Sequence, residues 1–187
     1  IKWLRQEHGG VVTKADSIDL DRADAAWTDQ FGWACAIQTA DCLPVLFCDI
    51  YSSYIAAAHV GWRGLLSDVL GNLITEVPVS SATMMAWLGP RIGPKVFQIG
   101  EKVRDEISSW ILNKGGSPDD FFHDHSYRQN FYLVDLARLA KFAISLAGIS
   151  KIYDSGYCSY SQSQMFFSHR RDLGRTGRMA TVIALRS

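Results

Sequence analysis

The amino-acid sequence predicts an α+β protein, a single-domain layered α/β sandwich whose sheet is mixed and largely antiparallel. The chain has 187 residues, the size of one domain, and 48% of them are hydrophobic, which allows a substantial core. Short apolar segments separated by brief turns are interspersed with segments of helical periodicity. No internal repeat and no Pro/Gly/Ser-rich linker divides the sequence, so we treat residues 1–187 as one domain.

The first half of the chain carries apolar runs that are typical of buried strands. The predicted strands span residues 33–38, 43–49 and 54–60. Residues 39–41 interrupt the first two runs, and a short turn at 51–53 separates the second from the third. Because strands joined by such short turns pair antiparallel, these runs predict hairpins rather than a wholly parallel sheet.

The remainder of the chain contains the predicted helices. After Gly61, leucine, isoleucine and valine recur every three to four residues, which predicts a helix over 64–77. A strand at 83–88 follows and ends at a turn rich in glycine and proline, residues 89–94. The remaining predicted elements are helices over 100–112 and 134–147 and closing strands near 164–168 and 178–185.

Charge and cysteine content exclude several functional classes. Nineteen basic residues balance nineteen acidic ones, so the chain lacks the positive field that attracts nucleic acid or anionic membranes. The strictly apolar runs, such as Leu43 to Cys48, fall far short of the roughly 20 residues that span a bilayer. The four cysteines are unevenly spaced, which favours free thiols in a reducing compartment. We therefore expect a cytoplasmic protein that binds neither nucleic acid nor membrane.

A cysteine and a histidine are expected to meet at the end of the predicted hairpin. If the second and third strands pair so that Asp49 faces Tyr54, Cys42 lies opposite Gly61. Side chains alternate between faces along a strand, so His59 projects from the same face as Cys42. A register shift of one residue would separate them.

Two chemical roles fit such a pair. His59 can act as a base that activates Cys42 as a nucleophile. Alternatively both bind zinc, and a third protein ligand such as His8 would leave the fourth position open for catalysis. Asp41 can orient a ligand, transfer a proton or simply cap a turn. Set against both roles, a buried cysteine is more often only a small hydrophobic residue.

Two arginine motifs are candidates for anion binding. Arg63 precedes the predicted helix at 64–77, where backbone N–H groups favour anions, although a structural ion pair is an equal alternative. Arg170 and Arg171, followed by Asp172, can contact substrate or form a surface charge cluster.

The motifs together resemble the YfiH-type laccase-domain family, whose members are named polyphenol oxidase or multicopper oxidoreductase laccase. They cover nearly the whole chain in the family's order: Gln6-Glu7-His8-Gly9, Thr39-Ala40-Asp41-Cys42-Leu43-Pro44, His59-Val60-Gly61-Trp62-Arg63-Gly64, Leu88-Gly89-Pro90, Ile92-Gly93-Pro94, Phe167-Ser168, Arg170-Arg171-Asp172 and Thr176-Gly177-Arg178.

The resemblance implies one zinc ion per chain, bound by His8, Cys42 and His59. It also implies phosphorolysis of adenosine, inosine, guanosine and methylthioadenosine, and deamination of adenosine, with purine nucleosides and phosphate as the partners. We assign Asp41 and Arg63 to the catalytic centre beside Cys42 and His59. We assign Arg63, Arg170 and Arg171 to the binding of phosphate or substrate. The protein is expected to be a monomer or a small homo-oligomer.

The resemblance also leaves alternatives. The family's fold is similar to that of a deamidating bacterial toxin with a Cys-His pair, which supports a cysteine hydrolase that cleaves an amide, for example in cell-wall precursors. A structural zinc in a binding module is a third reading. Multicopper oxidation needs many imidazoles, and the chain has five histidines, so copper and the polyphenol oxidase activity are disfavoured.

Two departures from the family pattern concern the beginning of the chain. Family members usually carry an N-terminal segment with an Arg-x-Gly-Gly-Val-Ser motif that this sequence does not contain, so part of the sheet or pocket is expected to lie outside it. Glu7 stands where valine is common, next to the expected ligand His8.

Overall fold

The computed structural model describes residues 1–17, 22–124 and 130–185. Its strands are β1 Lys2–Trp3, β2 Val12–Lys14, β3 Ala25–Thr28, β4 Ala34–Thr39, β5 Leu43–Asp49, β6 Ile55–Val60, β7 Met84–Leu88, β8 Gln98–Gly100, β9 Phe122–Asp124, β10 Phe131–Val134, β11 Lys151–Asp154 and β12 Met179–Ala184. Its helices are α1 Trp62–Leu66, α2 Val69–Glu76, α3 Glu101–Asn113 and α4 Leu136–Leu146, with the 3₁₀ turns η1 Ser81–Thr83 and η2 Pro118–Asp120.

The strands of the described residues form three sheets, which confirms the predicted α+β class. The largest has the order β11-β7-β5-β6-β3-β2, and two smaller sheets have the orders β1-β4-β12 and β8-β10-β9. Most neighbours are antiparallel, while β1 with β4, β2 with β3 and β7 with β11 are parallel. In the parts of the chain that are described, no helix combines the length and the apolar character that crossing a bilayer requires.

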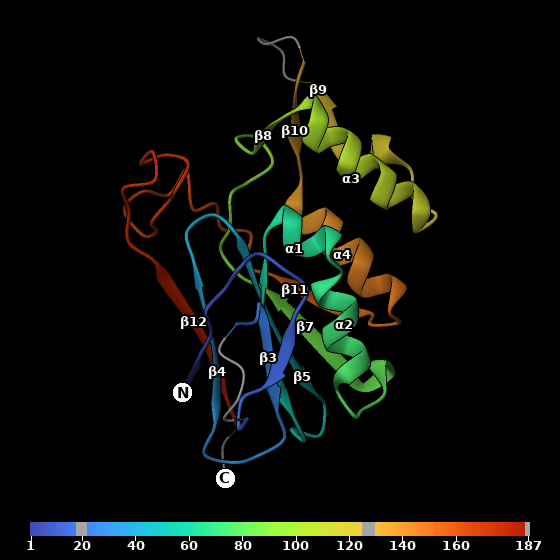
Figure 1. Ribbon diagram of the computed structural model, residues 1–187, viewed down its shortest axis with the longest axis vertical. Coiled ribbons are helices and arrows are strands. Elements are labelled where there is room, and N and C mark those ends of the chain that lie inside the picture. The colour runs from blue at the N-terminus through green and yellow to red at the C-terminus, as the bar shows by residue number, and fades with distance from the viewer. Residues whose placement is uncertain (18–21, 125–129, 186–187) are drawn as a thin grey trace.

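The large sheet is the central layer, and strand β6 is buried on both of its faces. Ile55 and Ala57 belong to a core shared with Ile37 of β4, between the large sheet and the β1-β4-β12 sheet. The alternate residues of β6, Ala56 and Ala58, belong to the main core beneath α1, α2 and α4. Figure 1 shows these helices on one side of the large sheet and β4 with β12 on the other. Burial on both faces explains why β6 is apolar at every position except His59 rather than alternating.

The predicted register of the β5–β6 hairpin is confirmed. Leu43 pairs with Val60 and Cys48 with Ile55, so the next pair in the same register is Cys42 and Gly61. Both residues lie at the open end of the hairpin, where the chain leaves the sheet.

Two predicted elements differ in the structure. The helix expected over 64–77 is divided into α1 and α2, because Asp68 between them adopts a left-handed conformation with φ of 57°. The prediction of a strand near 164–168 is wrong. The N–H groups of Met165 and Phe166 both donate to the carbonyl of Gln162, so this segment is held by local turns.

A partly buried ion pair joins the large sheet to the loop after β7. Asp154 accepts a hydrogen bond from Arg91 Nη2 at 3.0 Å and pairs with Lys141 Nζ at 2.7 Å. Burial by itself raises the pKa of Asp154, but the hydrogen bonds from Arg91 and Lys141 outweigh it and lower the pKa from 3.8 to about 2. The carboxylate therefore stabilises the fold above pH of about 4, and that contribution is lost as the pH falls towards 2.

Asp154→Asn is expected to lower the free energy of unfolding by about 1.5–3 kcal/mol at pH 7, because Arg91 loses a charged partner. Urea unfolding at pH 7 and at pH 2.5 measures this, and the difference between the proteins should shrink at the lower pH. A difference of equal size at both pH values would contradict the ionic origin.

Candidate active site

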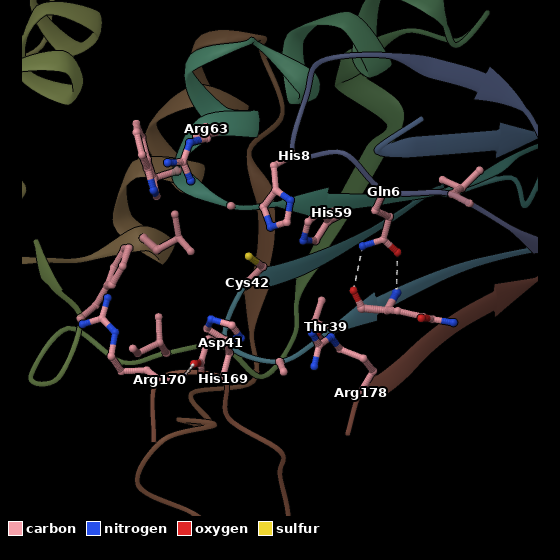
Figure 2. A pocket seen from close by; sticks show the side chains of 18 residues that line it. Gln6, His8, Thr39, Asp41, Cys42, His59, Arg63, His169, Arg170 and Arg178 are labelled. Atoms are coloured by element: carbon pink, nitrogen blue, oxygen red, sulfur yellow. Dashed lines mark hydrogen bonds between the residues drawn. The ribbon is translucent and has the colours of Figure 1, made fainter. Parts of the chain in front are cut away.

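A pocket of about 580 Å³ lies at the ends of β4, β5 and β6. His8, Cys42 and His59 stand in its centre (Figure 2). Apolar side chains, namely Trp62, Ile92, Phe97 and Leu136, line part of its wall. Polar side chains from Gln6, Gln38, Thr39, His169 and Arg178 line another part. The pocket thus offers a surface for a flat apolar group beside one for hydrogen bonding.

The three central residues come from separate parts of the chain. Cys42 directly precedes β5, His59 lies within β6, and His8 lies in the segment between β1 and β2. One ligating atom from each lies within 4.8 Å of the others. The His8 and His59 rings are edge to face, with their centroids 4.6 Å apart. His59 is buried and Cys42 half-buried, while His8 is exposed at the pocket mouth.

Asp24 holds this arrangement together, and the sequence did not single it out. Its carboxylate, 1% exposed, lies 2.8 Å from His59 Nδ1. It also accepts hydrogen bonds from the backbone N–H groups of Glu7, His8 and Gly9, at 3.2, 2.9 and 2.7 Å. These bonds stabilise the bend at His8, whose φ is 60°, and bring its ring to the pocket. The bond to Nδ1 leaves Nε2 of His59 as the nitrogen available to a ligand.

The electrostatics of the cluster favour a thiolate. Burial opposes ionisation of Cys42, but hydrogen bonds from His59 and His8 outweigh it and lower its pKa from 9.0 to about 7. Burial likewise opposes protonation of His59, but the bonds to Asp24 and Cys42 raise its pKa from 6.5 to about 9. Burial by itself raises the pKa of Asp24, but the hydrogen bonds with His59 and with the backbone N–H groups outweigh it and hold the pKa below 3.8.

The donor set fits a zinc ion. Tetrahedral zinc, with bonds of about 2.0–2.3 Å, holds its ligand atoms about 3.3–3.8 Å apart, so atoms within 4.8 Å need only a small contraction. Two imidazoles and a thiolate are ligands that zinc prefers, and the pocket beyond them can admit a fourth ligand. Among the described residues, no other group of three or more potential metal ligands converges in this way.

Asp41 lines the pocket but uses both carboxylate oxygens within the protein. Oδ1 accepts from Ser159 Oγ at 2.6 Å, and Oδ2 accepts from the backbone N–H of Arg170 at 2.7 Å. Its φ of 90° is unusual for a residue other than glycine. Asp41 therefore fastens the loop before β12 to the hairpin end that carries Cys42.

Three arginines line the pocket at separate places, as Figure 2 shows for Arg63, Arg170 and Arg178. The Arg63 guanidinium lies 4.4 Å from the Trp62 ring centre. His169 also lines the pocket and was missed by sequence reasoning, although it directly precedes the Arg170 motif. Within the described chain, none of these three arginines forms an ion pair with a carboxylate.

Arg171 differs from its neighbour Arg170. Its guanidinium pairs with Asp172 and donates to the carbonyls of Ser159, Tyr160 and Phe166, at 2.8–3.1 Å. It does not belong to the pocket lining. The structure thus directs this side chain into its own loop, where it organises the backbone, rather than into the pocket as the sequence led us to expect.

Gly61 provides a test of the crowding around the cluster. A Cβ atom at this position would lie 3.1 Å from Cys42 Sγ and 3.2 Å from His8 Cδ2. Gly61→Ala is therefore expected to lower the affinity for metal roughly 10–100-fold by displacing these two side chains. Competition with a chromogenic chelator measures the affinity.

Gly100→Ala is the matched control for this change. Both glycines are helix N-caps, with φ values of −86° and −85°, but a Cβ at Gly100 meets nothing within 4 Å. An equal loss of metal affinity in the two variants would show that the effect comes from the helix cap and not from crowding at the cluster.

Comparison with known proteins gives consistent matches over the whole chain. Residues 1–186 match the family model described as Multi-copper polyphenol oxidoreductase laccase. The chain is 39% identical over 183 residues to "Purine nucleoside phosphorylase PA4543" of Pseudomonas aeruginosa, covering 98% of this chain and 73% of that protein. It is 38% identical over 185 residues to "Purine nucleoside phosphorylase YfiH" of Escherichia coli K12, with the same coverage.

Solved structures have the same fold. Neisseria meningitidis protein NMB0706 superposes with a TM-score of 0.91 at 38% identity, covering 100% of this chain and 75% of that one. The Bacillus licheniformis hypothetical protein YfiH gives a TM-score of 0.87 at 28% identity, covering 98% of this chain and 73% of that one.

Proposed function

We propose that this chain, which belongs to the Multi-copper polyphenol oxidoreductase laccase family, is a zinc-dependent purine nucleoside phosphorylase that also deaminates adenosine. Adenosine, inosine, guanosine and methylthioadenosine are the proposed substrates. The observation that carries the proposal is the convergence of His8, Cys42 and His59 in a pocket whose lining includes three arginines that form no ion pair with any described carboxylate. The names of the relatives from Pseudomonas aeruginosa and Escherichia coli support the phosphorolytic reaction.

The pocket walls suit the parts of a purine nucleoside. The apolar wall around Trp62 and Phe97 offers rings and branched chains against which a purine can stack. Gln38 and Thr39 offer polar groups suited to ribose hydroxyls. A volume of about 580 Å³ lies within the usual range for small-molecule sites.

In phosphorolysis, an oxygen of phosphate bonds to the anomeric carbon while the bond to the purine nitrogen breaks. Arg63 is our first candidate to hold the phosphate, because its guanidinium is exposed and rests on Trp62 beside the cluster. The helix that begins at Trp62 has only five residues, so we assign the anion to the guanidinium charge rather than to a helix dipole. Arg170 is the second candidate.

Deamination requires water to attack the purine ring at C6 and ammonia to leave. Zinc, when bound, supplies the Lewis acidity that lowers the pKa of water to about 7. His59, oriented by Asp24, and His8, held by the bend that Asp24 stabilises, are the proposed nitrogen ligands, with Cys42 as the sulfur ligand. Asp41 is proposed as a positioning residue, because its oxygens already accept two hydrogen bonds.

Copper oxidation is the weaker reading of the family's name. A coupled copper cluster needs many more imidazoles than one site of two histidines and a cysteine supplies, and the whole chain has five histidines. We therefore propose about one zinc per chain and little copper.

A cysteine hydrolase is the second candidate function, and one observation favours it. Cys42, with a pKa of about 7, His59 and Asp24 form a chain of nucleophile, base and orienting carboxylate. This reading leaves His8 without a chemical role, whereas the zinc site uses all three converging residues. Chelator-resistant cleavage of an amide substrate would favour the hydrolase.

Chromatography of adenosine incubated with the purified protein tests the proposed function. With phosphate, the expected products are adenine and ribose 1-phosphate together with inosine and hypoxanthine. Without phosphate, only inosine should form, and a chelator should stop both routes. Absence of all these products in the protein loaded with zinc would refute the proposed function.

Arg63→Ala is expected to raise the KM for phosphate roughly 10–100-fold, the cost of losing a hydrogen bond to a charged group. Metal content should remain near that of the unchanged protein. Initial rates at varied phosphate measure the effect, and Arg138→Ala, an exposed arginine on α4 outside the pocket, is the control. If the KM for phosphate were unchanged, we would assign phosphate binding to Arg170 or Arg178 instead.

A further inference from the structure

A second cavity adjoins the reaction pocket. Its volume is about 260 Å³, and it is lined by Lys95, Val96, Gln98, Leu133, Tyr160 and Arg170. Arg170 lines both cavities. Its guanidinium lies 5.8 Å from the ring centre of Phe97, which is part of the apolar wall of the reaction pocket. The second cavity therefore lies beyond that wall, next to the space proposed for the nucleoside.

The boundary between the two cavities is fixed by hydrogen bonds. The Arg170 backbone N–H donates to Asp41, and its Nη1 donates to the carbonyl of Gln98 at 3.0 Å. The two loops that enclose the second cavity are also joined by the Gly93 N–H, which donates to Cys158 Sγ at 3.2 Å. An arginine held at both its backbone and its guanidinium is preorganised to receive a ligand.

The charge of the second cavity identifies the kind of ligand. Lys95 and Arg170 are cationic, and Tyr160 and Gln98 can donate hydrogen bonds. Among the described residues, no aspartate or glutamate belongs to the lining. In the described part of the chain, neither Lys95 nor Arg170 forms an ion pair. A guanidinium and an ammonium without a carboxylate favour phosphate groups.

The position of Lys95 favours a phosphate carried by the substrate. Lys95, Gln98 and Tyr160 do not belong to the lining of the reaction pocket that contains the His8, Cys42 and His59 cluster. A free phosphate held by Lys95 would therefore lie away from the cluster. The co-substrate phosphate already has Arg63 as its proposed partner, and Figure 2 shows Arg63 and Arg170 at separate places around the pocket.

We propose that the Lys95–Arg170 cavity binds the phosphate monoester of a purine nucleoside 5′-monophosphate, so that the protein cleaves nucleotides as well as nucleosides. The inference rests on the proposed function for its chemistry. An oxygen of inorganic phosphate bonds to C1′ and the bond from C1′ to N9 breaks. The purine keeps the electron pair and takes a proton from solvent. With adenosine 5′-monophosphate the products are adenine and ribose 1,5-bisphosphate.

The test compares adenosine with adenosine 5′-monophosphate as substrates of the protein loaded with zinc. In Lys95→Ala, the ratio of kcat/KM for the monophosphate to that for adenosine should fall at least roughly tenfold, the effect of one lost bond to a charged group. Lys102→Ala, an exposed lysine of α3 outside both cavities, should leave the ratio unchanged. Calorimetry with adenosine 5′-monophosphate should show the same loss of affinity in Lys95→Ala.

The outcomes separate this inference from the proposed function. If neither compound is cleaved but the monophosphate binds in a manner that depends on Lys95, the phosphate site stands and the phosphorolysis fails. If adenosine is cleaved and the monophosphate neither reacts nor binds, the inference is overturned. If Lys95→Ala instead raises the KM for inorganic phosphate with adenosine as substrate, the cavity serves the co-substrate and the monoester site is also overturned.

Discussion

Cys42→Ala is expected to abolish both phosphorolysis and deamination of adenosine, lowering each rate by more than about a hundredfold. Loss of the thiolate leaves two imidazoles, which hold zinc weakly, and the zinc content of the purified variant should fall with the activity. Chromatography of the adenosine products and elemental analysis measure the two effects on the same sample.

Cys48→Ala is the control for the removal of a thiol. Cys48 lies on β5, the strand that begins directly after Cys42. Burial raises the pKa of its thiol, and its side chain packs against the core between the large sheet and the β1-β4-β12 sheet. This variant should keep its zinc and its activity. If Cys42→Ala lost both activities while retaining a full equivalent of zinc, Cys42 would be a nucleophile rather than a ligand.

Asp24→Asn is expected to lower zinc affinity and the rate of both reactions roughly 10–100-fold. An amide side chain cannot replace the carboxylate, because Asp24 accepts from His59 Nδ1 and from three backbone N–H groups. The NH₂ group would face some of these donors and would also favour the wrong orientation of the His59 ring. Chelator competition and initial rates measure the loss.

Asp49→Asn separates this positioning role from a general loss of stability. Asp49 is 2% exposed and accepts hydrogen bonds from Ser53 N and Oγ, both at 2.7 Å, at the far end of the same hairpin. Both variants should unfold at lower temperature, but only Asp24→Asn should bind zinc more weakly. Equal zinc affinity in the two variants would reduce Asp24 to a structural residue.

The sequence was most informative where chemistry depends on local pairing. The hairpin register follows from two adjacent apolar runs and a short turn, and side-chain alternation then brings Cys42 and His59 to one face. The helices also follow from periodicity, apart from the division of the helix over 64–77 at Asp68. These features depend on residues that are close together in the sequence, so a local sequence pattern predicts them.

Short edge strands were not predicted. Strands such as β1, β8 and β11 have two to four residues, too few for a periodic pattern, and they exist because they pair with distant segments. Residues 164–168 have a strand-like composition, but the turn bonds to Gln162 satisfy their backbone instead. The competition between distant pairing and local turns is decided by the folded environment.

By itself, the sequence determined the fold class, the convergence of Cys42 with His59 and the arginine motifs near them. The family resemblance implied His8 as the third ligand, but only the tertiary structure showed how it joins the pair, because the bonds that hold it come from Asp24, sixteen residues away. Only the structure distinguished Arg170, which lines both cavities, from Arg171, which is bonded within its loop. The reason is physical: buried carboxylates and backbone carbonyls accept hydrogen bonds from the donors that lie nearest in space, and these distances cannot be read from the order of residues in the sequence.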